Sequence, residues 1–207
     1  MAQHYRTQGI ILQKQDVGEA DRVFTVFTED FGKLKLRAVS ERKIASKLRS
    51  GLDLFYLSNL DFIQGKAHKT VTNAFCLERF PILHGSIERL RLLYRLAEIT
   101  DELVAGQEKD DKIWHLLQET FSAFERPMLE TGDLRAYAYY FLWNLLACTG
   151  YAPSLSDIAA RDQNTAEFIG VLFRENIVHV RGVDLEKLDE RLLRSLSQEH
   201  LSKAFEA

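Results

Sequence analysis

The sequence predicts an α+β protein in which a small five-stranded barrel is followed by a domain built of helices. Up to Phe80, apolar residues alternate with polar ones or form short β-branched runs, a pattern typical of strands. After Pro81, apolar residues recur about every 3.6 positions, which is the period of a helix. We therefore expect a barrel domain over residues 1–80 and a helical domain over residues 81–207.

Five strands are expected before Phe80, and they cover residues 8–15, 21–29, 33–38, 52–63 and 67–77. The second and third are separated by a tight turn in which Gly32 can adopt positive φ. A loop rich in Ser, Lys and Arg follows over residues 40–51, with room for one helical turn. Five short strands with a long loop after the third fit a small closed barrel of the OB type. An SH3-like barrel is the alternative that the pattern leaves open.

Three long helices are expected after the barrel, over residues 87–104, 112–125 and 133–149. Ser86 is a suitable N-cap for the first. The third is apolar on nearly every side, which is typical of the central helix of a bundle. Gly150 fits the C-terminal cap of this third helix, and Pro153 prevents its continuation. Beyond residue 154 the helical spacing is weaker, and it covers residues 165–173 and 185–205.

Charge is distributed unevenly along the chain, although the formal net charge is only −3. Residues 1–80 contain 13 Lys/Arg against 9 Asp/Glu, whereas residues 81–207 contain 14 against 21. Between residues 33 and 49 there are seven cationic side chains and a single acidic one, Glu41. A basic first part joined to an acidic second part indicates that anion binding belongs to the first.

The most concentrated basic stretch combines the third expected strand with the loop that follows it. In the strand, apolar residues at 34, 36 and 38 alternate with cations at 33, 35 and 37, so one face packs and the other carries charge. Such a surface can neutralise the phosphates of a nucleic acid and release their counterions. The candidate DNA-binding residues are Lys33, Lys35, Arg37, Arg42, Lys43, Lys47 and Arg49.

Aromatic side chains of the barrel could add stacking surfaces for the bases of a single strand. The candidates are Phe24, Phe27, Phe31, Phe55, Tyr56 and Phe62. Most of them are expected in the core, because a small barrel needs several large side chains inside.

Several function classes find no support in the sequence. Cys76 and Cys148 are the only cysteines and lie far apart, so neither a disulfide framework nor a zinc cluster is expected. The chain has no phosphate-binding loop and no hydrolase motif, and its six histidines are scattered. No run is long and apolar enough for a membrane span. We expect a soluble cytoplasmic protein that is not an enzyme and needs no cofactor or metal.

A Mg²⁺-dependent nuclease is the catalytic alternative. Asp16, Glu19 and Asp21 are close in sequence, and hard cations prefer carboxylate oxygens. The competing interpretation is a polar hairpin turn in which Asp21 pairs with Arg22 or Lys14.

Two clusters of residues resemble the RecO family of bacterial DNA repair proteins. The first runs through Thr7-x-Gly9-Ile10-Ile11-Leu12, Gly18-Glu19-Ala20-Asp21-Arg22, Phe27-Thr28 and Gly32-Lys33. The second is Gly150-Tyr151-x-Pro153-x-Leu155. The resemblance extends from the N-terminus through about residue 155, with a weaker echo at His200-Leu201. It implies an OB-fold followed by a helical domain, as the patterns above predict.

The resemblance also implies a recombination mediator. Members bind single- and double-stranded DNA, anneal complementary strands, engage the acidic tail of single-stranded DNA-binding protein, pair with RecR and help to load RecA. A generic single-stranded DNA- or RNA-binding module remains the alternative. In the acidic helical part, which we expect to bind proteins, the cations available for an acidic peptide are Arg89, Arg91, Arg95, Arg126 and Arg135.

One departure from the family is plain. Many members carry zinc-binding C-x-x-C pairs just after the second cluster, and here Ile158 and Arg161 occupy the first two cysteine positions. Structural zinc is therefore not expected. The region beyond residue 155 must hold together by packing.

Overall fold

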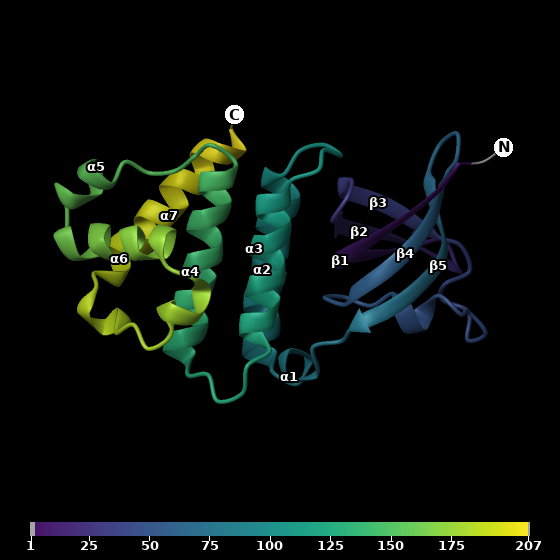
Figure 1. Ribbon diagram of the computed structural model, residues 1–207, viewed down its shortest axis with the longest axis horizontal. Coiled ribbons are helices and arrows are strands. Elements are labelled where there is room, and N and C mark those ends of the chain that lie inside the picture. Colours follow the sequence, from purple (N-terminus) through teal and green to yellow (C-terminus); the bar gives the residue numbers. More distant parts are fainter. Residues whose placement is uncertain (1–2, 207) are drawn as a thin grey trace. The chain divides into compact units, whose positions relative to one another are not determined.

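The computed structural model describes residues 3–206 (Figure 1). Two compact units are present. The first comprises the chain up to Pro81 together with Val104–Trp114, and the second comprises Ile82–Leu103 together with the chain from His115 onward. The expected domain boundary between residues 80 and 81 stays a prediction, and residues 1–2 and 207 of the expected domains lie outside the described part of the chain.

The first unit is a closed five-stranded barrel. Its strands are β1 (His4–Val17), β2 (Asp21–Thr28), β3 (Gly32–Ala38), β4 (Leu57–Gln64) and β5 (Lys69–Glu78). They are joined in the order β1-β2-β3-β5-β4, with β4 pairing back to β1. All pairs are antiparallel except β3 with β5. The prediction of an α+β protein with an N-terminal barrel of the OB type is confirmed.

The first strand is shared by two neighbours, which closes the barrel. Its first half pairs with β4 and its second half with β2, and a register shift between Ile11 and Gln13 bends it between the two. Such an irregularity increases the local twist, as a small barrel requires. Inward-facing apolar side chains from all five strands fill the interior, together with Leu52 from the loop after β3.

The expected fourth strand begins later than the sequence pattern indicates. Leu52, Leu54 and Phe55 are buried, but they belong to a loop, and Phe55 has a φ of +63° that no strand tolerates. A buried loop produces the same apolar run as a strand, so the pattern could not separate them. The one helical turn expected before it is present as the 3₁₀ helix η1 (Arg49–Gly51).

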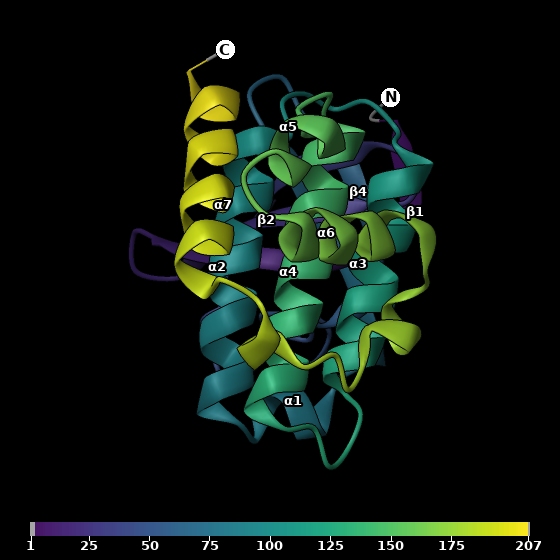
Figure 2. The same cartoon turned by 90° about the vertical axis from the view of Figure 1, so that its left-hand side faces the viewer.

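The second unit is helical, as predicted. The elements of the helical region are α1 (Pro81–His84), α2 (Ile87–Leu103), α3 (Asp111–Phe124), α4 (Thr131–Cys148), α5 (Leu155–Ala159), α6 (Gln163–Arg174), η2 (Ile177–Val180), η3 (Leu185–Lys187) and α7 (Glu190–Phe205). The first turn of α3 is part of the first unit. Helix α4 packs against α2, α6, η2 and α7, which confirms its predicted central place (Figure 2). Gly150 follows α4 with a φ of +89°, as a C-terminal cap requires.

The segment beyond residue 155 holds together by packing and capping. Its helices begin at side-chain N-caps, among them Ser154, Asp162 and Asp189. Ile158 is 3% exposed, so an apolar core contact occupies one expected cysteine position. The helix expected over residues 185–205 is split, because Asp189 caps a new helix there. Within the described residues, no helix is both long and apolar enough to cross a membrane.

Candidate nucleic-acid interface

Strand β3 has the two faces that its sequence predicts. Leu34, Leu36 and Ala38 are at most 1% exposed and face the barrel interior. On the opposite face Lys35 is exposed, whereas Lys33 and Arg37 are half-buried. The cations of this strand are therefore accessible, although unequally.

Arg37 is held by an acidic neighbour from β2. Its Nη2 and Nε lie 2.7 and 3.0 Å from Oδ2 of Asp21. The other oxygen of Asp21 accepts the backbone N–H of Ser40 at 2.8 Å. The hydrogen bond from the Ser40 amide, and to a smaller extent that from Arg37, lowers the pKa of Asp21. The predicted partners of Asp21 are thus wrong: it pairs across the strands with Arg37.

The two residues predicted to pair with Asp21, Arg22 and Lys14, form ion pairs with other carboxylates. Arg22 lies 2.7 Å from Asp16 and 3.1 Å from Glu41, and Lys14 lies 2.6 Å from Asp53. The hydrogen bond from Arg22 lowers the pKa of Asp16, and Asp16 in turn raises the pKa of Arg22. Glu41 is 1% exposed, so the single acid of the basic stretch is buried against a cation.

Arg42 attaches the start of the loop to the β1–β2 hairpin. Its Nη1 donates to the carbonyl of Gly18 at 3.1 Å, and its backbone N–H donates to the carbonyl of Ala20 at 3.0 Å. Together with the Glu41–Arg22 pair, these contacts fix the base of the loop to the barrel.

Beyond this attachment the loop presents its charges to solvent. Lys43, Lys47 and Arg49 are exposed, and Ile44 between them is 94% exposed. The loop then returns to the barrel through η1, which packs against β5. We define the cationic loop as residues 39–51.

Lys33 lies apart from the other candidates. It is four residues from Arg37, about 13 Å along the strand. Its neighbour Gly32, with a φ of +59°, packs so closely against the backbone of Glu108 that a Cβ would overlap it. Arg37 therefore lies at the end of β3 that leads into the cationic loop, Lys35 lies in the middle of the strand, and Lys33 lies at its opposite end.

The aromatic candidates behave as core residues. Phe24, Phe27, Phe55 and Phe62 are at most 1% exposed, and half-buried Phe31 packs edge-on against Tyr5 and Phe62. Tyr56 is also half-buried, with Arg79 5.9 Å above its ring. One aromatic residue that the sequence reasoning missed is Phe75 on β5, which is 65% exposed. Strict alternation would have placed Phe75 on the same face as buried Val71; a register shift between Val71 and Asn73 in the pairing with β4 turns Phe75 outward.

The acidic turn offers little to a metal ion. Asp16 and Asp21 both form ion pairs with arginines, and Glu19 is exposed to solvent. In the part of the chain that the structure describes, no group of three His, Cys, Asp or Glu side chains is arranged to hold a metal. The contacts fit a polar hairpin turn, although Asp21 pairs with Arg37 and not with the predicted partners.

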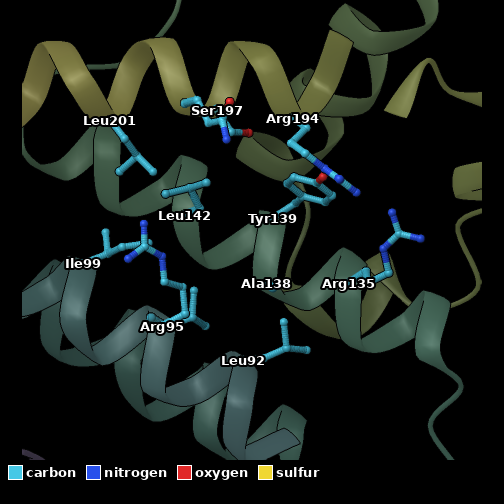
Figure 3. Close-up of a pocket in the computed structure, with 12 residues that line it drawn as sticks. Leu92, Arg95, Ile99, Arg135, Ala138, Tyr139, Leu142, Arg194, Ser197 and Leu201 are labelled. Atoms are coloured by element: carbon cyan, nitrogen blue, oxygen red, sulfur yellow. The ribbon is translucent and has the colours of Figure 1, made fainter. Parts of the chain in front are cut away.

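A second feature is an apolar groove in the helical unit, with a volume of about 300 Å³ (Figure 3). It lies between α2, α4 and α7, and its apolar lining includes Leu92, Leu96, Ile99, Leu142 and Leu201. Three arginines, Arg95, Arg135 and Arg194, also line it. Arg135 lies 2.6 Å from Glu190, and this contact raises its pKa.

Of the arginines expected to meet an acidic peptide, Arg95 and Arg135 line this groove. Arg89 does not, because it is 7% exposed and donates to the carbonyls of Phe124 and Arg126 at 2.6 and 2.8 Å. Arg194 was not among the expected residues: it lies in the helical stretch expected over residues 185–205, but the sequence does not show which face of that helix meets α2 and α4.

Comparison with known proteins identifies both parts of the chain. Residues 1–80 match the family model "Recombination protein O N terminal", and residues 84–204 match "Recombination protein O C terminal". Proteins named DNA repair protein RecO from Roseiflexus sp. (strain RS-1) and Heliobacterium modesticaldum are 33% and 37% identical, over 75% and 73% of this chain. A relative of the same name from Dehalococcoides mccartyi (strain ATCC BAA-2266 / KCTC 15142 / 195) is 30% identical over 75% of this chain. The matches cover 53%, 54% and 60% of these relatives, so the chain spans little more than half their length.

Proposed function

Because the chain belongs to the recombination protein O family, we propose that it is a recombination mediator in DNA repair rather than an enzyme. In this proposal it binds single- and double-stranded DNA, anneals complementary strands and helps to load RecA onto DNA coated by single-stranded DNA-binding protein. RecR and the acidic tail of single-stranded DNA-binding protein are its direct partners. It would work beside the chromosome in the bacterial cytoplasm.

The observation that supports DNA binding best is the cationic loop with its attachment. Glu41 and Arg42 fix the base of the loop, while Lys43, Lys47 and Arg49 in the loop and Lys35 on β3 are exposed. Exposed cations on a loop whose base is fixed can neutralise phosphates and release their counterions. Arg37 and Arg42 add positive charge, although both have contacts within the protein. Lys33 would contact the DNA only if the bound strand extends along the whole of β3.

A salt titration tests this assignment. Replacing Lys35, Lys43, Lys47 and Arg49 by Gln is expected to weaken single-stranded DNA binding. It should also reduce the slope of log K against log[salt] by about 0.7 for each phosphate that is no longer neutralised, so by up to about 3 in total. Fluorescence anisotropy with a labelled oligo(dT) at several salt concentrations measures both quantities.

The matched control removes the same charge from the helical unit. Arg91, Lys187, Arg191 and Lys203 are all exposed, and replacing them by Gln should leave the slope unchanged. Equal slopes for the wild type and the loop variant would show that the DNA site has been misassigned.

The groove between α2, α4 and α7 supports the protein-binding half of the proposal. Its lining is apolar, and it is bordered by cations, which suits a peptide that combines acidic and apolar residues. We therefore propose it as the site for the tail of single-stranded DNA-binding protein. A protein that binds DNA but neither anneals strands nor binds this tail would instead be a generic single-strand-binding module.

A further inference from the structure

Phe75 presents an aromatic ring to solvent from the outer surface of the barrel. It lies on β5 (Figure 1) and is 65% exposed, and Leu77, two residues on, is 43% exposed. The pairing of β5 with β4 is irregular between Cys76 and Glu78, so the regular alternation of side chains does not continue through Leu77. An exposed aromatic ring offers a large apolar surface with a flat face to a ligand.

The neighbours of Phe75 are amides rather than core residues. Its cross-strand partner on β4 is Asn59, and the partner of Asn59 on β1 is Gln8. Both amide side chains are half-buried. In the next row Asp61 lies 2.6 Å from Arg6 and also accepts a hydrogen bond from Asn73, and the Arg6 contact lowers the pKa of Asp61. Asp61 is therefore paired with a cation within the sheet.

The cationic loop reaches β5 beside this aromatic side chain. Gly51 in η1 packs directly on Ala74, where an added Cβ would overlap the carbonyl oxygen of Ala74. Ala74 precedes Phe75, and Arg49 begins the same short helix as Gly51. The cationic loop therefore reaches β5 at Ala74, the residue next to Phe75 in the chain.

From this arrangement we infer that Phe75 is a stacking platform for a base of single-stranded DNA whose phosphates lie against Lys47 and Arg49. Stacking on an aromatic ring is insensitive to base identity, while Asn59 and Gln8 present donors and acceptors to base edges. Duplex DNA keeps its bases stacked and paired, so it cannot use this platform. The inference rests on the proposed function and deepens it, because it assigns a single-strand-specific contact to the barrel.

Binding of Phe75→Ala to two oligonucleotides tests the inference. Removing the ring is expected to weaken oligo(dT) binding by about 5- to 150-fold, the range for one stacked base. Binding to an oligonucleotide of abasic sites, which keeps the phosphates, should be unchanged. The salt slope should also be unchanged, because the variant keeps every cation. Phe75 is exposed, so the variant should unfold at the wild-type temperature, and circular dichroism checks this.

A spectroscopic readout complements the affinity measurement. In Phe75→Trp the new indole should be quenched by oligo(dT) and not by the abasic strand, since the native Trp114 and Trp143 are 2% and 0% exposed. The matched control is Leu77→Ala, which removes apolar surface without an aromatic ring.

The outcomes separate the inference from the proposed function. If the wild type binds oligo(dT) and Phe75→Ala binds it equally well, the platform is refuted. Weakened binding of both oligonucleotides by Phe75→Ala would refute stacking as well. If the wild type binds neither oligonucleotide, the proposed DNA binding itself fails.

Discussion

At the scale of single residues, the most unusual side chain is Glu41, a carboxylate that is 1% exposed inside the most basic stretch of the chain. Its partner Arg22 also contacts Asp16, so one guanidinium joins the loop to the hairpin. The charge that makes the stretch look less basic in sequence is what keeps the loop in place. The basic character of this stretch could be read from the sequence. The ion-pair partners could not, because they depend on the register of the strands.

Replacing Glu41 by Gln should destabilise the barrel. The substitution weakens a buried hydrogen bond and leaves the charge of Arg22 less compensated, at a cost of about 1–3 kcal/mol in the free energy of unfolding. Urea denaturation followed by circular dichroism measures this change. The control is Glu19→Gln in the same hairpin, where the side chain is exposed and a change within about 0.5 kcal/mol is expected. Equal stabilities of the two variants would contradict the role given to Glu41.

At the scale of elements, the spacing of apolar residues predicted strands and helices well wherever the buried side chains follow that spacing. Strand β3 and helix α4 match their predicted ranges within one or two residues, because the alternation at 34, 36 and 38 and the all-apolar run of α4 have one interpretation each. The start of β4 was placed too early, because Leu52 and Phe55 are buried in a loop. The groove could not be predicted, since its lining comes from three helices far apart in the chain.

The groove gives a prediction at this scale. Reversing the charge of Arg194 on α7 to Glu should weaken the binding of a peptide that combines acidic and apolar residues by about tenfold or more. An attraction becomes a repulsion at the border of an apolar, partly dehydrated site. Isothermal titration calorimetry measures the affinity. Arg191 lies on the same helix but does not line this groove, so Arg191→Glu is the matched control. An equal decrease in affinity for both variants would indicate non-specific attraction.

At the scale of the whole molecule, the unequal charge of the two parts agrees with separate roles. The part before Pro81 has a balance of +4, from 13 Lys/Arg and 9 Asp/Glu, and the rest has −7, from 14 and 21. This could be read from the sequence, as could the order of barrel and helices. Barrel closure could not, because the pairing of β3 with β5 joins strands more than thirty residues apart.

The stability of the whole chain should fall in mild acid through His200. Burial lowers the pKa of this side chain, and nearby Lys203 and Arg161 lower it further, against the opposing effects of Glu199 and the backbone of Tyr151. Its ring packs against the indole of Trp143 with centroids 5.4 Å apart. The folded state therefore resists a proton that the unfolded chain accepts at its ordinary pKa of about 6.5.

The sign of the pH effect follows directly. Above that pKa both states are neutral at this position, and as the pH falls below it the unfolded state binds more protons, so the free energy of unfolding decreases. Urea denaturation at pH 7.5 and pH 5.5 should show a smaller decrease for His200→Asn than for the wild type. The same change at exposed His115 should not alter the decrease. If His200→Asn keeps the wild-type pH dependence, another group is responsible.

The parallel junction that closes the barrel has a consequence for its dynamics. Among the described residues it joins Leu36 to Lys69 and Arg37 to Thr70, while every other junction extends over at least seven residue pairs. Thermal fluctuations should open the barrel first at its shortest strand pairing. The amides of this pairing should therefore take up deuterium before those of the other strand pairs. The loop of residues 39–51 bridges this join from β3 to β5. A DNA strand bound along this loop would hold the junction closed. It would therefore slow deuterium uptake in both β3 and β5.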